Sequence, residues 1–324
     1  MSEKGRDVAV IVVAWNSAAE LASAVGSVPA GVPVVVVDNA STDSSADVAA
    51  RAGARVRRLH SNMGFGPACN AGVEEARKEN AGVRAFLFLN PDAALVEGER
   101  SLDALLLELS RDPEVGAAAP RLEGEGQEIF QLRKLPTFGS LAREALFLNR
   151  LWPENPWLRR ERYLDRKRTE PFDVEQPAGA ALLVRREAFE AVGGFDPAFA
   201  PAWFEDVDLC AKLWKSGWRI RYVPASHATH VGGTTMRRLP YADYLPLYTR
   251  NLLRYLSRHS GPATRASSRA VLLLGALLRF ALLPFVMGDH ERGDAARAYR
   301  RVVRGLCGFG FESALLEAPG SGRA

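Results

Sequence analysis

The chain has 324 residues, of which 47% are apolar and 25% are charged, and its formal net charge is +4 at pH 7. This composition predicts a soluble globular protein with one large or two modest domains. Cys69, Cys210 and Cys307 have no metal-binding or redox spacing, and the first residues lack a basic region followed by an apolar one, so a cysteine metal site and a secretory leader are not expected. We therefore expect a cytoplasmic protein, and we expect no nucleic-acid partner.

Apolar runs alternate with segments of helical spacing along the first third of the chain. The predicted strands are residues 8–15, 32–37, 55–60 and 85–89, and the predicted helices are residues 18–28, 43–52, 67–80 and 99–109. Ser41 or Thr42 could cap the second helix. The first two strands are continuously apolar, as in parallel sheets that are buried on both faces. The alternation predicts an α/β fold with a mostly parallel sheet and flanking helices.

The turn after the first strand excludes one common α/β protein. It reads Trp15-Asn16-Ser17 and lacks the Gly-x-Gly-x-x-Gly pattern with which a dinucleotide-binding domain approaches a pyrophosphate. The strand ends instead offer an aromatic ring and hydrogen-bonding groups that suit a nucleobase and a ribose. These residues are Trp15, Asn16, Asp38, Asn39, Ser41 and Asp43.

Clustered acids and imidazoles predict an enzyme. Asp92 closes the run Asn90-Pro91-Asp92 after the strand at 85–89, where an open α/β sheet usually presents its ligands. Glu205, Asp206 and Asp208 begin a predicted helix, and two histidines follow about twenty residues later. Such groups suit a general base and a hard metal ion, so the sequence predicts a metal-assisted transferase cleft.

Each of these residues also has a structural interpretation. Asp92 could cap the following turn, and Glu205 could cap the helix instead of binding an acceptor. We expect Asp208 to pair with Lys212 four residues later, and we expect a structural role for His227. Trp214 and Trp218 are expected in the core.

Seven motifs in order resemble family 2 glycosyltransferases. They are VDNASTD at 37–43, NMGFGPACNAG at 62–72, NPD at 90–92, PAGAALLVRR at 177–186, GGFD at 193–196, the acid pair at 205–206 and HVGG at 230–233. The resemblance covers residues 8–235, and within the family the chain looks most like the bacterial rhamnosyltransferase branch. It implies a GT-A fold, which transfers a sugar from a nucleotide with inversion at the anomeric carbon.

The resemblance also implies roles for individual residues. Asp206 would be the general base, with Glu205 beside it, and Asp92 and His230 would hold Mg²⁺ or Mn²⁺ against the donor diphosphate. The expected donor-binding residues are Trp15, Asn16, Asp38, Asn39, Ser41, Asn62, Gly64, Asn70, Asn90 and Asp92. The expected acceptor-binding residues are Gly179, Trp203 and Glu205. The metal motif departs from the family by reading Asn-Pro-Asp instead of carrying two aspartates.

The end of the chain is basic. Residues 250–304 carry eleven arginines, no lysine and three acids, and a largely apolar run at 270–287 is interrupted by Arg279 and Pro284. Arg279 at mid-bilayer would cost roughly 3 kcal/mol or more, which disfavours a spanning helix. A core helix, a helix lying on an anionic membrane, and a contact with a second subunit remain as alternatives. Residues 133–168 predict an acceptor loop or a small helical insertion.

These observations predict a catalytic domain at residues 1–240, with a nucleotide-sugar half at 1–115 and an acceptor half at 116–240, and a helical, membrane-associating tail at 241–324. The predicted function is an inverting glycosyltransferase that moves a sugar, with rhamnose as one candidate, to a saccharide or polyprenyl-linked acceptor in cell-surface polysaccharide or glycolipid synthesis. The predicted location is the inner face of the cytoplasmic membrane. A non-catalytic nucleotide-sugar binding protein and a sugar-1-phosphate nucleotidyltransferase are the alternatives, and the sequence does not specify the sugar, the base, the acceptor or the oligomeric state.

Overall fold

The computed structural model describes residues 7–124, 126, 130–232, 239–286 and 288–311. The chain divides into two compact units, of which the first comprises Met1–Leu135 and Arg162–Gly232 and the second Pro136–Glu161 and Gly233–Ala324. The second unit therefore takes a segment from the middle of the chain as well as the C-terminal helices. The predicted boundary at residue 240 lies a few residues after the last point at which the chain passes from the first unit to the second, at Gly232.

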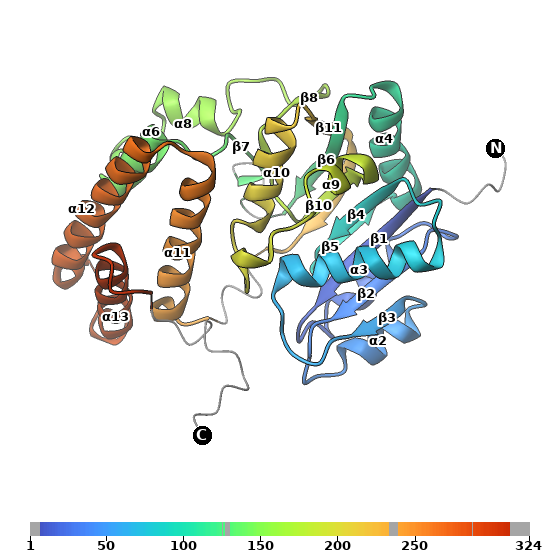
Figure 1. Cartoon of the computed structure of the whole chain (residues 1–324), viewed down its shortest axis with the longest axis horizontal. Helices are drawn as coiled ribbons and strands as arrows, with labels where there is room; N and C mark the ends of the chain where they lie inside the picture. Colours follow the sequence, from blue (N-terminus) through green and yellow to red (C-terminus); the bar gives the residue numbers. More distant parts are fainter. Residues whose placement is uncertain (1–6, 125, 127–129, 233–238, 287, 312–324) are drawn as a thin grey trace. The chain divides into compact units, whose positions relative to one another are not determined.

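A nine-stranded mixed sheet forms the first unit (Figure 1). Its order is β3-β2-β1-β4-β10-β6-β11-β5, and β8 pairs with β11. The strands are β1 (Val8–Ala14), β2 (Val34–Asp38), β3 (Arg55–Arg58), β4 (Ala85–Leu89), β5 (Ala93–Val96), β6 (Val115–Glu123), β8 (Phe172–Asp173), β10 (Ala181–Arg185) and β11 (Arg219–His230). The first four strands are parallel, and β10 joins β4 in the antiparallel direction. A separate ribbon pairs β7 (Leu132–Arg133) with β9 (Gln176–Pro177).

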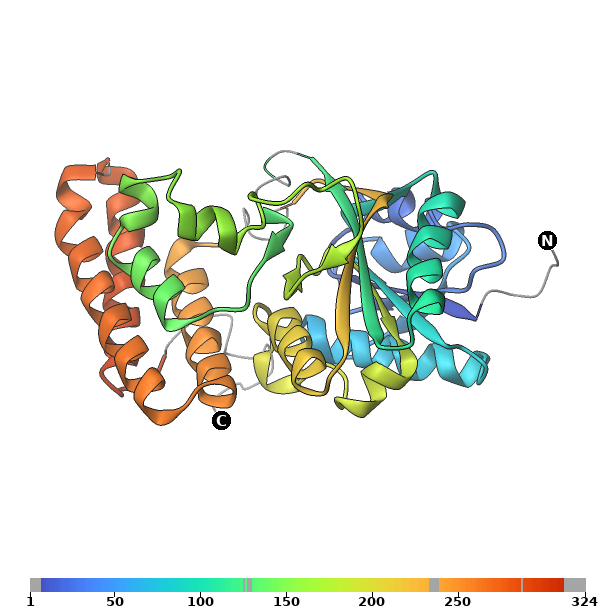
Figure 2. The ribbon, with the colours of Figure 1, turned by 90° about the horizontal axis from the view of Figure 1, so that it is seen from above.

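Helices cover both faces of this sheet (Figure 2). The helices are α1 (Leu21–Gly26), α2 (Ser45–Arg51), α3 (Phe65–Glu79), α4 (Gly98–Arg111), α9 (Arg186–Ala191) and α10 (Glu205–Lys215), with a 3-10 turn at Pro197–Phe199. Alternate residues of β1 feed two cores: Val10 and Val12 pack with α1, α2 and α4, whereas Ile11 and Val13 pack with α3, α9 and α10. The predicted α/β architecture is confirmed.

All eight predicted strands and helices of the first third are present, with shorter ends in most cases. The predicted cap of α2 is wrong, because Ser44 occupies that position without a side-chain hydrogen bond and Asp43 accepts the Ser45 N–H instead, at 2.9 Å. Ser41 turns away from the helix, and its hydroxyl accepts a hydrogen bond from the Asn16 N–H at 3.0 Å. The helix start is thus fixed by Asp43, which lies one residue before the N-cap.

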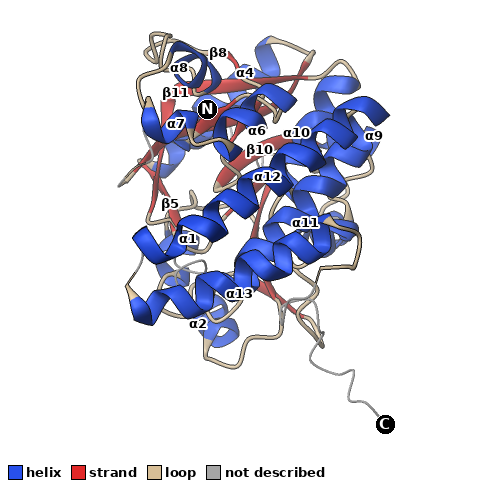
Figure 3. Cartoon of the chain, turned by 90° about the vertical axis from the view of Figure 1, so that its left-hand side faces the viewer, coloured by secondary structure: helices blue, strands red, loops and turns tan. Residues whose placement is uncertain are grey.

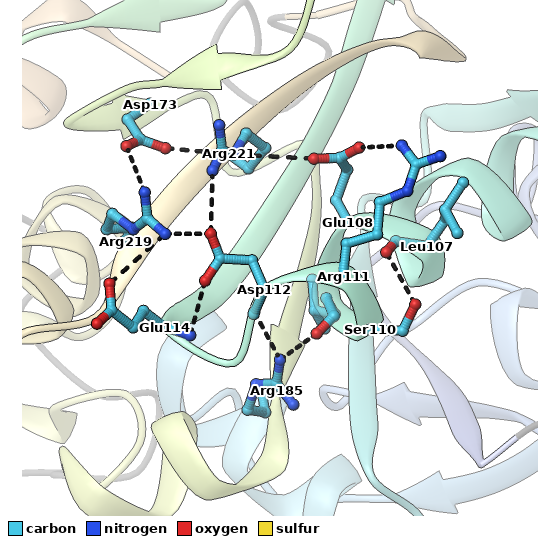
Figure 4. Close-up of polar contacts among 11 residues, drawn as sticks. Leu107, Glu108, Ser110, Arg111, Asp112, Glu114, Asp173, Arg185, Arg219 and Arg221 are labelled. Carbon is cyan, nitrogen blue, oxygen red and sulfur yellow. Dashed lines mark hydrogen bonds and ion pairs between the residues drawn. The ribbon is translucent and has the colours of Figure 1, made fainter.

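An ionic network ties β8 and β11 to α4 at the amino end of β11 (Figure 4). Arg221 lies 3.2 Å from an Asp173 oxygen, 3.5 Å from an Asp112 oxygen and 3.9 Å from a Glu108 oxygen. Arg219 also pairs with Asp112 and with Asp173. A hydrogen bond from the Glu114 N–H and the charges of the two arginines outweigh burial and lower the pKa of Asp112. This network lies at the amino end of β11, at the opposite end of that strand from His230.

The second unit is helical (Figure 3). Its helices are α6 (Phe138–Ala145), α7 (Leu148–Leu151), α8 (Pro156–Glu161), α11 (Tyr241–His259), α12 (Pro262–Val286) and α13 (Asp289–Leu306). The segment predicted as a loop or helical insertion is thus an insertion. Ala276, Leu283, Ala295 and Val302 pack α12 against α13, and Arg301 pairs with Asp243 of α11 at 2.9 Å. Among the described helices, α12 is the one that is long and apolar enough to cross a membrane by length and composition.

Candidate active site

The predicted site residues gather at one edge of the sheet. Strands β1, β2 and β4 are parallel and end at Ala14, Asp38 and Leu89, so their carboxyl ends meet there. The antiparallel strand β10 begins at the same edge, because Ala181 pairs with Leu89. Residues that follow the parallel strands and residues that precede β10 are therefore neighbours, although some of them are about ninety positions apart in the sequence.

The donor-side residues bind mainly to one another. Asp38 is 5% exposed and accepts the Ser41 N–H at 3.1 Å, and Asn16 accepts the Thr42 N–H at 2.8 Å. Asn39 donates to Asn62 at 2.8 Å and also accepts a backbone N–H, so both ends of its amide are engaged. These contacts hold the backbone beside Trp15 in place, and Trp15 itself is 38% exposed.

The backbone conformation and a neighbouring carbonyl group require glycine at position 64. It has φ of +86°, and a Cβ at this position would lie 2.6 Å from the Pro201 carbonyl oxygen. The next residue, Phe65, donates its N–H to that same oxygen at 2.9 Å. Gly64 was predicted as a donor contact, and the structure shows it joining the start of α3 to the loop that precedes α10.

Asn70 is likewise engaged by the protein. Its side chain donates to the Phe195 carbonyl at 2.7 Å and accepts the Phe195 N–H at 3.0 Å, so the amide holds the turn before the 3-10 helix. This arrangement leaves little hydrogen-bonding capacity for a nucleotide. Asn90 contributes its backbone N–H to the Ala180 carbonyl at 2.8 Å.

Asp92 and His230 lie side by side. The His230 Nε2 is 3.4 Å from an Asp92 carboxylate oxygen, and the two side chains are 14% and 8% exposed. The pairing of β11 with β5 sets His230 opposite Ala93, which explains why residues so distant in sequence meet. The His230 Nδ1 is enclosed and has no hydrogen-bond partner among the described residues.

The side chains of Asp92 and His230 are suitable as two ligands of a divalent cation. An oxygen and an imidazole nitrogen that converge are acceptable to Mn²⁺ or Mg²⁺, which commonly complete their shells with water and substrate phosphate. Within the described residues no group of three His, Cys, Asp or Glu side chains converges. Asp92 and His230 would be two of the ligands, and the donor diphosphate would supply others.

Asp206 meets the same sheet edge through the short segment that precedes β10. A Cβ on Gly179 would lie 3.0 Å from a carboxylate oxygen of Asp206 and 3.1 Å from its Cβ, so a side chain at this position would press the carboxylate away. The Gly179 N–H is near enough to Asp206 to lower the pKa of its carboxyl. Since Ala180 binds Asn90, a segment of two residues links the predicted base to the predicted metal motif.

The surroundings of Asp206 act on its protonation. Burial raises the pKa of this carboxyl above its ordinary value, while hydrogen bonds from the Val207 and Gly179 N–H groups and the charge of Arg133 oppose the rise. Arg133 belongs to β7, next to the β9 strand that leads into Gly179. A raised pKa makes a carboxylate a better acceptor of protons near neutral pH.

Glu205 faces the interior of the protein. It is 8% exposed, its Cβ is close to Gly66 of α3, and its Oε2 is enclosed without a hydrogen-bond partner among the described residues. Burial, together with the negative charge of Asp206, raises the pKa of Glu205 to about 8. A neutral carboxyl group beneath the site is more consistent with this burial than a direct acceptor contact.

The structural roles that were predicted for four neighbouring residues are confirmed. Lys212 Nζ lies 3.2 Å from Asp208, which confirms the predicted pair. His227 lies 2.7 Å from Glu123 on the strand beside it, and Trp214 and Trp218 pack against the core, as predicted.

Trp203 and Phe204 have φ of +71° and +73° immediately before α10. For bulky residues this conformation is strained, and such strain is commonly found at functional sites.

Sequence reasoning missed Arg133 and Pro201. Arg133 lies in a segment with weak periodicity, and its approach to Asp206 depends on the two-stranded ribbon of β7 and β9. Pro201 gave a turn signal, yet nothing in the sequence indicated that its carbonyl would meet Gly64 and Phe65. Both contacts join segments more than forty residues apart.

The sequence is similar to those of known glycosyltransferases. The family model described as glycosyl transferase family 2 matches residues 9–193, and a model described as the N-terminal domain of galactosyltransferase matches residues 166–236. The N-acetylglucosaminyl-diphospho-decaprenol L-rhamnosyltransferase of Mycobacterium tuberculosis is 34% identical over 243 residues, which are 71% of this chain and 76% of that protein.

Solved structures show the same fold. The mannosyltransferase PcManGT from Pyrobaculum calidifontis, in complex with GDP-Man and Mn²⁺, has a TM-score of 0.55 at 14% identity and covers 93% of this chain and 88% of its own. GalNAc-T7 with UDP, GalNAc and Mn²⁺ has a TM-score of 0.54 at 18% identity over 78% of this chain and 48% of its own. The predicted GT-A fold is confirmed, and the chain is a glycosyltransferase that belongs to glycosyl transferase family 2.

Proposed function

We propose that this glycosyltransferase moves a sugar, with rhamnose as the first candidate, from a nucleoside diphosphate to a saccharide on a lipid diphosphate, with inversion and with Asp206 as the general base. The observation that supports this most is the segment Gly179–Ala180, which sets Asp206 and the Asn90–Asp92 run at one sheet edge. Base and leaving-group site must adjoin for a direct displacement.

The sugar and the acceptor come from the relative's name alone. That M. tuberculosis protein is named for L-rhamnose transfer to N-acetylglucosaminyl-diphospho-decaprenol, and this chain spans 76% of it. A lipid-linked acceptor also places the enzyme at a membrane, so we include in the proposal a peripheral position on the anionic inner face of the cytoplasmic membrane. Self-association is left open by this proposal.

The reaction needs one proton transfer and one substitution. The acceptor hydroxyl oxygen attacks the anomeric carbon, the bond from that carbon to the diphosphate oxygen breaks, and the hydroxyl proton passes to the Asp206 carboxylate. The raised pKa of Asp206 favours this transfer, and the hydrogen bond from the Val207 N–H, at 2.8 Å, helps to fix the direction of the carboxylate. The nucleoside diphosphate leaves with the electron pair of the broken bond.

Asp92 and His230 would hold a divalent cation, which offsets the charge that develops on the diphosphate. Asp38, with Asn16 and Ser41 fixed beside it, would contact the base or ribose of the donor. Trp15 is exposed enough to stack on a nucleobase. We propose that Trp203 and Gly179 face the acceptor, with Trp203 as the platform for the acceptor sugar.

The test is transfer by the purified full chain. Nucleoside diphosphate sugars of the uridine, deoxythymidine and guanosine series are each supplied with Mn²⁺ and a short-chain lipid diphosphate bearing N-acetylglucosamine. Formation of a disaccharide product with one donor, with inverted configuration by NMR, is the expected result. Nucleotide binding without any transfer across the panel would favour a non-catalytic binding protein instead, and retained configuration would contradict the direct displacement.

A further inference from the structure

Helix α12 presents apolar side chains outward. Leu274, Leu278 and Phe285 are 48%, 40% and 83% exposed, and they recur at i, i+4 and i+11, which places them on one face of the helix. Leu277 and Leu282 flank this face and are 46% and 41% exposed. A surface helix of a globular protein normally buries its apolar face and exposes its polar one.

The opposite face of α12 packs inside the second unit (Figure 3). Ala276 and Leu283 are 6% and 4% exposed, and a Cβ on Gly275 would lie 2.8 Å from the Ala145 carbonyl oxygen of α6. Arg279 is on this inner side, where it donates to the Ala145 carbonyl at 2.6 Å and lies over the Phe147 ring at 4.2 Å.

The outward face therefore has no charge over four turns. Arg279 is the one charged residue between positions 270 and 285, and its guanidinium is engaged by α6. These contacts explain how an arginine is tolerated in an otherwise apolar helix, because its guanidinium binds α6 and does not face outward. A contiguous outward apolar surface of this kind usually marks an interaction surface.

The inserted segment also exposes aromatic and aliphatic side chains. Leu146, Leu151, Trp152 and Trp157 are 43%, 80%, 48% and 52% exposed, and they follow α6 at the point where α6 meets α12. Trp residues with one apolar and one polar edge concentrate at membrane–water interfaces.

The positive charge of the second unit favours anionic lipid over a second copy of the chain as the partner of this surface. Residues 239–311 contain eleven arginines and four acids, a net charge of +7, and Arg297 and Arg300 of α13 are exposed. Two copies of such a surface would bring like charges together, whereas anionic lipid headgroups would attract them. A spanning arrangement would have to remove α12 from α6 and α13 and would place Arg279 in the hydrocarbon.

We propose that α12 lies in the plane of an anionic bilayer surface, with Leu274, Leu277, Leu278, Leu282 and Phe285 inserted at the boundary between headgroups and acyl chains. Trp152 and Trp157 anchor the inserted segment at the same boundary, and the arginines of α13 contact lipid phosphates. The inference rests on the proposed function, because a lipid-linked acceptor resides at this surface.

The test is co-flotation of the full chain with vesicles of phosphatidylcholine alone or with added phosphatidylglycerol. We expect binding to the anionic vesicles at low salt, weaker binding at high salt, and release by alkaline carbonate. Replacing Leu274 and Leu278 by Glu should lower the vesicle partition coefficient by about tenfold or more, since both side chains leave the apolar boundary. Leu107→Glu is the matched control, because Leu107 is 45% exposed on α4 of the other unit.

Activity separates this inference from the proposed function. The L274E/L278E variant should keep its transfer rate on a short-chain soluble acceptor and lose it on an acceptor embedded in vesicles. Unchanged flotation of this variant, or resistance of the wild type to carbonate, would overturn the in-plane arrangement. A concentration-dependent dimer that the two substitutions abolish, without vesicle binding by the wild type, would assign the surface to a second copy. Absence of transfer with intact vesicle binding would count against the proposed function alone.

Discussion

Gly179 and Asp206 are in contact at the candidate active site, so that a side chain at position 179 would displace the carboxylate by a few tenths of an ångström. A Cβ on Gly179 would lie 3.0 Å from the Asp206 carboxylate, which is closer than most such contacts in proteins. The glycine thereby fixes where the carboxylate stands relative to the Asn90–Asp92 run, since Ala180 is bonded to Asn90. The position of the Asp206 carboxylate therefore depends on the absence of a side chain at Gly179.

Gly179→Ala should lower kcat by about tenfold to a hundredfold, because displacing a catalytic group by a fraction of an ångström costs rate steeply. Nucleotide affinity should change little, because Asp38 and Trp15 are on other strands. Steady-state kinetics and nucleotide titration measure the two effects. Gly26→Ala is the control, since a Cβ there meets nothing within 4 Å. A fully active Gly179→Ala enzyme would remove the positioning role.

Glu205 should make the protein less stable as the pH rises. Its pKa is about 8 in the folded chain against an ordinary value of 4.5, so the folded state binds more protons than the unfolded state between these values. The stability that the neutral carboxyl provides is complete below pH 4.5, declines through this window, and is lost above pH 8. Glu205→Gln, which stays neutral, should remove this decline, on the order of a few kcal/mol at most.

Denaturation of wild type and Glu205→Gln at pH 5, 7 and 8.5 measures this dependence. The variant should gain relative stability with each step, and at pH 7 it should retain activity within a few-fold. Glu74→Gln is the control, because the Glu74 side chain is 62% exposed. A difference between Glu205→Gln and wild type that does not vary with pH would contradict a buried neutral carboxyl.

The sequence predicted the fold from repeated local patterns. Continuous apolar runs such as residues 8–15 and intervening helical spacing are local properties, and they placed the strands and helices of the donor half correctly. The insertion at 136–161 was harder, because its helices are short and derive their partners from α12, more than a hundred residues later. No local pattern carries that information.

The candidate site was predictable by residue type and less so by contact. Carboxylates and imidazoles after strands pointed to Asp92, Asp206 and His230, and the structure brings Asp92 and His230 together. Amides such as Asn70 were predicted as ligand contacts, yet an amide serves backbone turns equally well, and Asn70 does so at Phe195. Choosing between these roles requires the tertiary partner.

His230→Ala and Asp92→Asn should each abolish the Mn²⁺-dependent part of the stabilisation by a nucleoside diphosphate. A ligand at 100 times its Kd stabilises a protein by about 2.7 kcal/mol, which a thermal denaturation scan detects readily. His227→Ala is the control, because His227 pairs with Glu123 and not with Asp92. Equal Mn²⁺-dependent shifts in His230→Ala and wild type would exclude His230 as a ligand.

Arg219→Met should lower the Tm by a few degrees at low salt. Its guanidinium contacts Asp112 and Asp173, and removing it leaves both acids beside each other with one arginine fewer. The loss should shrink at high salt, because screening weakens partly exposed charge pairs. Arg58→Met, which removes an exposed pair with Asp47, should change the Tm much less. Equal shifts for the two variants would show that the network adds nothing beyond a surface pair.

The most direct measurement is the rate of sugar transfer by Asp206→Asn, made alongside its affinity for the donor nucleotide. The amide has nearly the size of the carboxylate and keeps one oxygen that can accept a hydrogen bond. It cannot take the proton from the hydroxyl group of the acceptor at neutral pH. The account predicts nucleotide affinity close to wild type and a loss of transfer by several orders of magnitude. Transfer at an undiminished rate would contradict Asp206 as the base.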